Sequence, residues 1–349
     1  MPQISSAQLT HFAQNLLQAG GLSAAEASLV AHSLVQANLR GHDSHGVMRI
    51  PYYLEALNKR EVVAGADFTI IRQQPAIIQA DGHWGFGQTQ MRRLLDLLLD
   101  MVKTTGVAVG TLIRSSHIGR LGEYCELAAE AGMVSMLMVN THGHARRVAP
   151  PGGIAPRLGT NPLAFGVPAE NGPLILDFGT SATAEGKVRL RKIAGQQVPT
   201  GWLLDNQGQP TTDPNTLYGS PPGTILPLGG EQGFKGFALG MMVEIFAGAL
   251  SGGVCIREQP LNQNGNCVFM QVFDPAALGG AEHFRDEVAQ LLNFIRNTPL
   301  ASGVEKIQLA GDPERQCLGE RTARGIPIDQ ANWNQLLTLA SNLGVEFSQ

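Results

Sequence analysis

A change of pattern near residue 67 is the feature of this chain that most limits its fold. Before it, apolar residues recur at helical spacing, as in Leu9, Phe12 and Leu16. After it, short apolar runs typical of strands alternate with longer helical patterns, and the end of the chain is helical again. We predict strands over 68–71, 76–80, 107–113, 134–139, 163–167, 174–178 and 268–273, and helices over 88–103, 122–131, 237–250, 281–296 and 329–342.

This alternation favours the α/β class, with a central body and a helical domain built from both ends of the chain. We place the helical domain at 1–66 plus 305–349 and the α/β body at 67–304. Two stretches near 141–162 and 195–233 are rich in Gly, Pro, Asn and Thr and lack clear periodicity. They are too long to be simple connections, so we predict functional loops there.

Charge and composition exclude several classes of function. The net charge is −4, charged residues make up 15% of the chain, and no basic stripe occurs, which argues against nucleic acid as a partner. We find no uninterrupted apolar run long enough to span a bilayer and no signal-peptide pattern at the start of the chain. The four cysteines are widely spaced with no CxxC pair, which is typical of reduced thiols in a cytoplasmic protein.

The densest cluster of reactive side chains lies in the glycine-bracketed segment 41–49. It combines Ser44, His45 and Arg49 with a second imidazole and a carboxylate. Packing rarely requires so many polar groups on one loop. Arginine binds carboxylates in a bidentate manner, and histidine exchanges protons near neutral pH. We therefore predict a site for a small anionic molecule that gains or loses a proton.

A second cluster, Ser115-Ser116-His117-Ile118-Gly119-Arg120, follows a predicted strand and precedes a predicted helix. Ligands commonly bind at such a junction, where backbone N–H groups and Arg120 would suit a phosphate. A serine-capped helix with a structural histidine explains the cluster better when it is taken alone, but the first His-and-Arg loop favours a functional role. The chain has no GxGxxG fingerprint and no Walker A loop, so a nucleotide would bind by another route.

Three further segments fit a binding role, although structural explanations compete with each. Thr160 and Asn161 belong to a polar turn that could fix a substrate, but on residue types alone a plain turn is favoured. Asp177 ends a predicted strand, where it could bind a ribose hydroxyl or cap a helix. Lys235 lies near glycines before a helix and suggests an anion contact, although a solvated lysine is the usual case.

Two other chemistries are not expected. The histidines at 42, 45, 142 and 144 match no spacing of zinc ligands, so we predict no metal. Ser44 precedes His45, but adjacent residues usually do not present their side chains to each other. The chain also lacks a GxSxG elbow, so we expect no nucleophilic serine.

Together, several segments resemble the type-2 malate/L-lactate dehydrogenase family over nearly the whole chain. They are GHDSHGVMRIPYY from residue 41, SSHIGR from 115, RLGTNPLAF from 157, LDFGTSA from 176, GFKGFAL from 233 and ALSGG from 249. The likeness is greatest to the bacterial hydroxycarboxylate dehydrogenases. It implies a mixed-sheet, non-Rossmann body that binds NAD(P) and substrate, interconversion of small 2-oxo and 2-hydroxy acids, and a homodimer with active sites near the subunit interface.

The resemblance also implies roles for particular residues. Ser44, His45, Arg49 and His117 fall on catalytic and substrate positions, and Asn161 with Thr160 would orient the substrate. The implied cofactor-binding residues are His45, Gly119, Arg120, Leu121, Asn140, Asp177, Phe178, Gly179, Lys235, Gly311 and Asp312. One departure is the segment Ala310-Gly311-Asp312, where many members have Pro-Gly-Glu and therefore a longer carboxylate.

A mechanism follows from these roles. The nicotinamide would exchange a hydride with C2 of the substrate, Arg49 would hold the carboxylate, and one imidazole would transfer the proton. We favour His117 for the proton, and His45 is the rival. We expect NAD as cofactor from the resemblance alone, and NADP is the alternative if Arg189, Arg191 or Lys192 forms a phosphate pocket.

Two other functions stay open. A cyclic ketimine reductase acting on piperideine- or pyrroline-2-carboxylate would need the same carboxylate clamp and proton source. A non-catalytic metabolite-binding protein is a more distant alternative, because the set of Ser44, His45, Arg49 and His117 is intact. The substrate side chain is not determined by these residues, and the loops 141–156 and 195–225 would select it.

Overall fold

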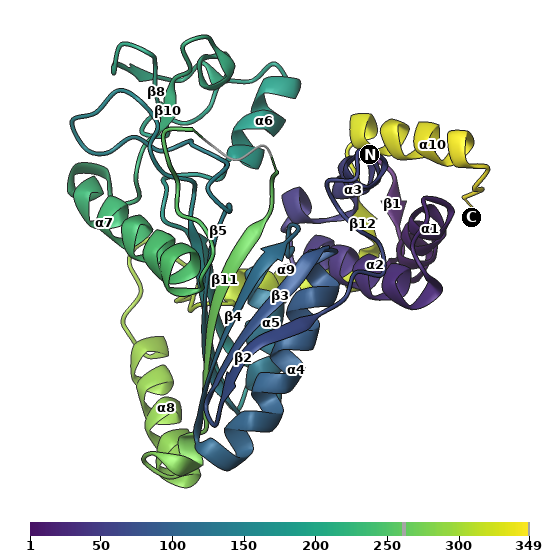
Figure 1. Cartoon of the computed structure of the whole chain (residues 1–349). Coiled ribbons are helices and arrows are strands. Elements are labelled where there is room, and N and C mark those ends of the chain that lie inside the picture. Colours follow the sequence, from purple (N-terminus) through teal and green to yellow (C-terminus); the bar gives the residue numbers. More distant parts are fainter. Residues whose placement is uncertain (260–262, 348–349) are drawn as a thin grey trace.

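The computed structural model, which describes residues 1–259 and 263–347, confirms an α/β fold around a seven-stranded mixed sheet (Figure 1). The strand order is β2-β3-β4-β11-β5-β6-β7. Strands β3 and β4 pair in parallel, and every other neighbouring pair is antiparallel. The bounds are β2 Thr69–Gln74, β3 Ile77–Gly85, β4 Val107–Ser115, β5 Val134–Asn140, β6 Pro162–Val167, β7 Leu174–Gly179 and β11 Asn266–Phe273.

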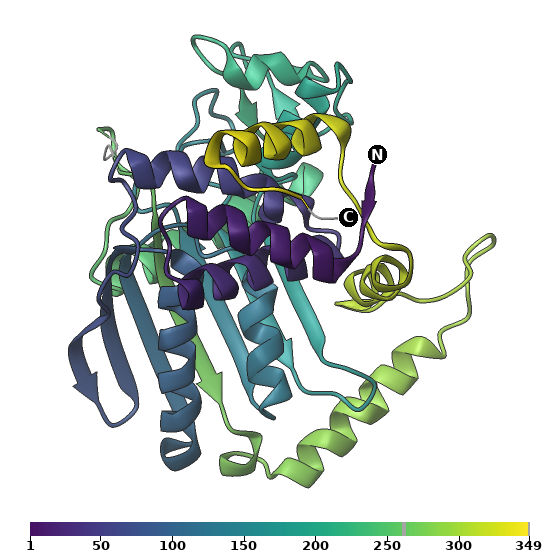
Figure 2. The ribbon, with the colours of Figure 1, turned by 90° about the vertical axis from the view of Figure 1, so that its right-hand side faces the viewer.

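Helices cover both faces of this sheet (Figures 1 and 2). Helices α4 (Gly87–Thr105) and α5 (Leu121–Glu130) pack on one face, and α7 (Gly233–Glu244) packs on the other. Gly110 in β4 allows the close approach of α4, because a Cβ there would lie 2.8 Å from one Leu98 methyl carbon. The π-helix Ile245–Leu250 continues α7, as irregular helical turns often do near functional sites.

The helical domain draws on both ends of the chain, as the sequence predicts. Helices α1 (Ser6–Ala19), α2 (Ala24–Leu39), α3 (Ile50–Asn58) and α10 (Gln330–Leu343) share one hydrophobic core. Within it, the rings of Phe12 and Trp333 lie 5.7 Å apart. Strands β1 (Gln3–Ile4) and β12 (Ile326–Pro327) join the two chain ends, and α9 (Asp312–Arg324) packs beside α2. The boundaries 1–66, 67–304 and 305–349 stay predictions.

Part of the stretch expected to be irregular is ordered. Strands β8 (Leu203–Leu204), β9 (Pro210–Thr211) and β10 (Thr224–Ile225) form a small sheet beside α6 (Glu185–Ile193). Val188, Leu203, Leu217 and Ile225 give this part its own small core. Two-residue strands carry too little periodicity to be found from the sequence.

The segment Gly230–Leu250 is long and apolar enough, by length and composition alone, to cross a membrane. The sequence analysis missed it because Lys235 and Glu244 interrupt the apolar run. In the fold, Val243 packs with Met138 and Phe269 of the sheet. We therefore interpret this segment as a helix that covers the sheet on one side and leaves its outer side exposed.

Candidate active site

The candidate site is a cavity of about 280 Å³ between the helical domain and one end of the main sheet. Strands β4 and β5 end beside it, and β6 and β11 begin there. The cavity brings together segments that are far apart in the sequence. The predicted residues that line it are Ser44, His45, Arg49, His117, Gly119, Leu121, Asn140 and Thr160.

The two candidate histidines lie side by side in the lining of this cavity. Their rings stack with centroids 5.4 Å apart and planes 26° apart. Ser44 Oγ lies 3.0 Å from His45 Nδ1, so the expectation that these neighbours would not meet is wrong. A 3₁₀ turn over Asp43–His45 folds the loop tightly enough for the contact.

Burial and positive charge keep both imidazoles neutral. Burial, followed by the charge of Arg49, lowers the pKa of His45 to about 3. The same two causes, in the same order, hold the pKa of His117 well below its usual range. Burial and a nearby cation both disfavour the protonated form of a histidine, and a bound anion would favour that form.

Arg49 provides the positive charge of the site. Its Nε donates to the Ser44 carbonyl oxygen over 2.7 Å, which fixes the direction of the side chain. No carboxylate of the described residues forms an ion pair with it. Arg147, which the sequence analysis did not select, is a second arginine lining the cavity. The cavity can therefore bind an anion.

His117 is held by groups on two sides. The Tyr53 hydroxyl lies 2.8 Å from His117 Nδ1, and the Gly119 backbone N–H donates to the same nitrogen over 3.3 Å. Asn266 Oδ1 accepts from the backbone N–H of Ile118. Tyr53 and Asn266 were not predicted as site residues, because a tyrosine in a helix and an asparagine at a strand end usually have structural roles.

Asn140 and Asn161 share one buried carboxylate, Glu244. Its two oxygens accept from Asn140 Nδ2 over 2.9 Å and from Asn161 Nδ2 over 2.7 Å. Asn161 also donates to the Gly240 carbonyl oxygen. Asn161 is fully buried and does not line the cavity in this conformation, whereas Thr160 does. A lone carboxylate in an apolar helix was the signal that could have identified Glu244.

The predicted phosphate and ribose residues lie together at the start of α5. Arg120 is buried and donates to Glu126 over 2.6 Å, while its Nε and Nη1 have no hydrogen-bond partner in the described part of the chain. Asp177 accepts from the Gly122 backbone N–H over 2.7 Å, and burial raises the pKa of its carboxyl. A Cβ at Gly122 would collide with Arg120 Nη1, so a larger residue there would force the Arg120 side chain to move.

The remaining predicted residues lie outside the cavity. Gly311 starts α9 with a φ of 85° and packs against Ile175, near Asp177 in β7. Asp312 is used within its own turn, where it accepts from the Leu309 backbone N–H and from Arg315. Phe178 and Gly179 end β7, and Gly179 packs against Thr160. Lys235 is exposed on α7, with its Nζ over the Phe234 ring.

The cluster of histidines does not form a metal centre in the part of the chain that the structure describes. No group of three His, Cys, Asp or Glu side chains there is arranged to hold an ion. His142 instead contacts the Cys267 thiol, with Nδ1 and Sγ 3.0 Å apart.

Comparison with known proteins identifies relatives of this chain. The family model for malate/L-lactate dehydrogenase matches residues 4–337. The L-lactate dehydrogenase of Cupriavidus necator is 36% identical over 98% of both chains. Hydroxycarboxylate dehydrogenase B of Escherichia coli is 34% identical over 97% of this chain and 94% of the relative.

Solved structures agree with the sequence matches. A proposed malate/lactate dehydrogenase from E. coli has a TM-score of 0.93 at 32% identity, covering 99% of this chain and 96% of that one. The delta1-piperideine-2-carboxylate reductase of Pseudomonas syringae has a TM-score of 0.84, also at 32% identity, covering 97% and 100%.

The fold and these matches define an oxidoreductase of the hydroxy-acid dehydrogenase class. The chain belongs to the malate/L-lactate dehydrogenase family, which confirms the resemblance identified from its motifs. The family implies a nicotinamide cofactor.

Proposed function

We propose that this protein is an NAD(P)-dependent dehydrogenase that interconverts a small 2-oxo acid and the corresponding 2-hydroxy acid. The observation that carries the proposal is Arg49, a cavity-lining cation with no carboxylate partner among the described residues, beside the neutral imidazole of His117. This pair matches what a 2-oxo acid needs, namely a cation for its carboxylate and a proton source at its carbonyl oxygen.

The residues at the start of α5 fit a dinucleotide. Arg120 carries two buried N–H positions without partners, which suit a phosphate, and Asp177 suits a ribose hydroxyl. When bound, the nicotinamide supplies or accepts the hydride at C2 of the substrate. We favour NAD, and NADP is the alternative, because a basic cluster at Arg189, Arg191 and Lys192 could hold a further phosphate.

The side chains of the cavity handle binding and the proton. Arg49 binds the carboxylate, and this added negative charge favours the protonated form of His117. During reduction, the His117 Nε2 proton moves to the oxygen on C2, and oxidation returns it to the same nitrogen. Nε2 is the candidate because Nδ1 is engaged with Tyr53 and Gly119. His45 and Ser44 pack beside the substrate position.

The low pKa of His117 predicts different pH profiles for reduction and oxidation. Before substrate binds, His117 is neutral at neutral pH, since its pKa lies well below its usual value. Reduction needs the protonated ring, so its kcat/KM should fall about tenfold per unit from about pH 6 to 9, whereas the kcat/KM of oxidation should stay flat. A flat profile for reduction would show that the proton comes from another group.

A cyclic ketimine reductase is the second candidate function. The similarity to a piperideine-2-carboxylate reductase supports this candidate, because an imine substrate needs the same cation for its carboxylate and the same proton source. We would mix the protein with NADH or NADPH and pyruvate, oxaloacetate, phenylpyruvate, 2-oxoglutarate, or pyruvate plus methylamine. Loss of the reduced-cofactor absorbance with a 2-oxo acid alone supports the dehydrogenase. Loss only in the presence of amine supports the ketimine reductase, and no loss supports a protein that binds without turnover.

Arg147 is a candidate selector of the substrate side chain. It lines the cavity from the loop 141–156, which the sequence analysis proposed as a specificity loop. Two arginines in one cavity suit a substrate with two acid groups. In the panel above, this favours oxaloacetate over pyruvate.

We also propose a homodimer that buries the exposed apolar sides of α7 and α8 (Ala281–Arg296). Helix α8 lies apart from the core elements of the body in Figures 1 and 2. None of its residues is buried, and Leu291 is 54% exposed and Phe294 80% exposed. Exposed apolar surface of this kind marks an interface between proteins.

The substitution Leu291→Glu should convert this dimer to a monomer, because it places a charge within the apolar side of α8. Light scattering after gel filtration measures the mass. Asn293→Glu introduces the same charge on the other side of the helix and should leave the dimer intact. A monomeric wild-type protein, or a dimer that tolerates Leu291→Glu, would contradict the proposed interface.

A further inference from the structure

A chain of buried hydrogen bonds leads away from His117. Gln88 Nε2 donates to the Tyr53 hydroxyl over 2.9 Å, and that hydroxyl lies 2.8 Å from His117 Nδ1. Gln88 is only 1% exposed and Tyr53 only 3% exposed. Because water has little access to these bonds, the orientation of the Gln88 amide is transmitted to the imidazole.

The donors around this chain fix its direction. The Gly119 backbone N–H can only donate, and its long 3.3 Å contact with His117 Nδ1 favours this nitrogen as an acceptor in the resting form. Because Nδ1 has one lone pair, the shorter 2.8 Å contact with the Tyr53 hydroxyl is its main hydrogen bond. The Gln88 amide nitrogen can also only donate, so the Tyr53 proton is directed to His117. The proton of the neutral ring therefore resides on Nε2 in this arrangement.

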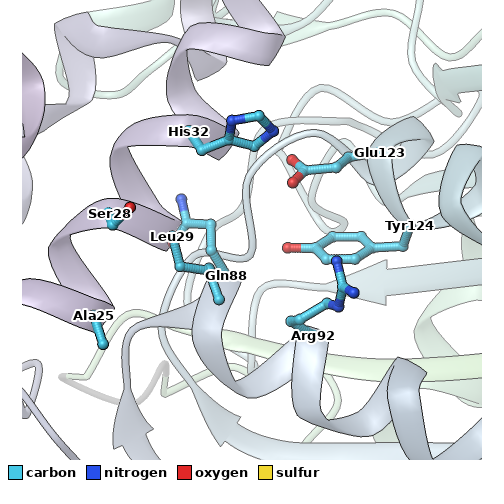
Figure 3. A pocket seen from close by; sticks show the side chains of 8 residues that line it. All are labelled: Ala25, Ser28, Leu29, His32, Gln88, Arg92, Glu123 and Tyr124. Carbon is cyan, nitrogen blue, oxygen red and sulfur yellow. The ribbon is translucent and has the colours of Figure 1, made fainter. Parts of the chain in front are cut away.

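A second cavity adjoins the other end of the chain (Figure 3). It has a volume of about 390 Å³ and lies between α2, α4 and α5, with Gln88, Tyr124 and Glu123 among its lining residues. Gln88 Oε1 is buried and has no hydrogen-bond partner within residues 1–259 and 263–347. Rotation about the terminal bond of glutamine is soft, and the cavity offers room and polar surroundings for the amide nitrogen after a half turn.

A half turn of the Gln88 amide would reverse the chain. Its oxygen would then accept from Tyr53, and the Tyr53 oxygen would accept from a proton on His117 Nδ1, since a hydroxyl both donates and accepts. The long contact between the Gly119 N–H and Nδ1 would be lost in this form. The acid–base step needs a proton on Nδ1 in both directions. In reduction, the doubly protonated ring gives its Nε2 proton to the substrate oxygen and keeps Nδ1–H. In oxidation, the Nδ1–H ring takes the hydroxyl proton onto Nε2.

We propose that Gln88 and Tyr53 are positioning residues that switch His117 between a resting form with the proton on Nε2 and a working form with a proton on Nδ1. The inference rests on the proposed acid–base role of His117. The charged or titratable groups around the chain are Arg49 and His45 beside His117, and Arg49, Tyr52 and Glu123 near Tyr53. His32, Arg92, Glu123 and Tyr124 line the cavity beside Gln88.

Nuclear magnetic resonance of protein with ¹⁵N-labelled histidine tests the switch without any turnover. His117→Gln identifies the signals of the ring among those of the nine histidines. We expect Nε2–H in the wild type near neutral pH. In Gln88→Glu, whose carboxylate can only accept, we expect Nδ1–H. A wild-type ring with Nδ1–H, or a Gln88→Glu ring that keeps Nε2–H, would overturn the proposal.

The pH profile provides a second test on active enzyme. A carboxylate at position 88 stabilises a proton on His117, so the falling limb of kcat/KM for reduction should move upward by about one unit or more. Tyr53→Phe cuts the chain, so adding it to Gln88→Glu should remove most of this shift. An undiminished shift would mean that the charge acts through space.

Thr89→Val is the matched control on α4, because the Thr89 hydroxyl is buried without a partner and lies outside the chain. It should leave the tautomer and the pH profile unchanged. If Gln88→Glu does not fold, Gln88→Met decides the question, because it removes the donor that directs the Tyr53 proton to His117. It should weaken the Nε2–H preference, and a Gln88→Met ring that keeps the full preference would overturn the proposal. A protein that is inactive on every 2-oxo acid but shows the expected tautomers would disprove the proposed function and leave the switch standing.

Discussion

His117→Gln is expected to lower kcat for 2-oxo acid reduction by roughly a hundred- to ten-thousand-fold, the usual contribution of a positioned acid. Its Nε2 is the imidazole nitrogen that we assign to the substrate oxygen, since Nδ1 is engaged with Tyr53 and Gly119. Glutamine cannot supply the proton. Cofactor binding, measured by fluorescence titration with NADH, should change little.

His45→Gln is the control that separates the two histidines. His45 Nδ1 contacts Ser44, and its ring stacks on His117, so the variant should disturb packing and retain much of the activity. If His45→Gln abolishes turnover while His117→Gln does not, the roles of the two imidazoles are exchanged.

Arg49→Met should raise KM for the 2-oxo acid by roughly ten- to a hundredfold. Hydrogen bonds to a charged group contribute about 1.5–3 kcal/mol, and 1.4 kcal/mol corresponds to a factor of ten. The loss of binding free energy should be close to this range because Arg49 has no carboxylate partner of its own among the described residues. Steady-state kinetics measures the change.

Arg49→Met should also move the pH profile of reduction. Arg49 lowers the pKa of His117, so its removal should shift the falling limb to higher pH. Arg146→Met removes an arginine that does not line the cavity and donates to the Glu258 carbonyl oxygen, so it should change neither KM nor the profile. An unchanged KM in Arg49→Met would refute the carboxylate clamp.

The seven strands of the main sheet were predictable because each apolar run is long enough to show its pattern, as in Val107–Ser115 and Asn266–Phe273. Their order was not predictable, since β11 is inserted between β4 and β5 from far along the chain. Long-range pairing leaves no local signal. The two-residue strands near 203, 210 and 224 were missed for lack of length.

The reactive residues that line the candidate site were predictable because they cluster on two loops, around His45 and His117. The residues that support them were not. Glu244, Asn266 and Gln88 act through partners more than 30 positions away in sequence, and each alone resembles an ordinary helix or strand residue. Their roles appear only when the fold brings Asn140, Asn161 and Tyr53 next to them.

Transfer of deuterium from a reduced nicotinamide cofactor that carries deuterium at both C4 positions tests the central claim most directly. The protein would be incubated with the labelled cofactor and the most active 2-oxo acid, and the product examined by mass spectrometry and proton NMR. The account predicts a 2-hydroxy acid carrying deuterium at C2. A product without deuterium at C2, or incorporation of deuterium only when an amine is present, would contradict the account.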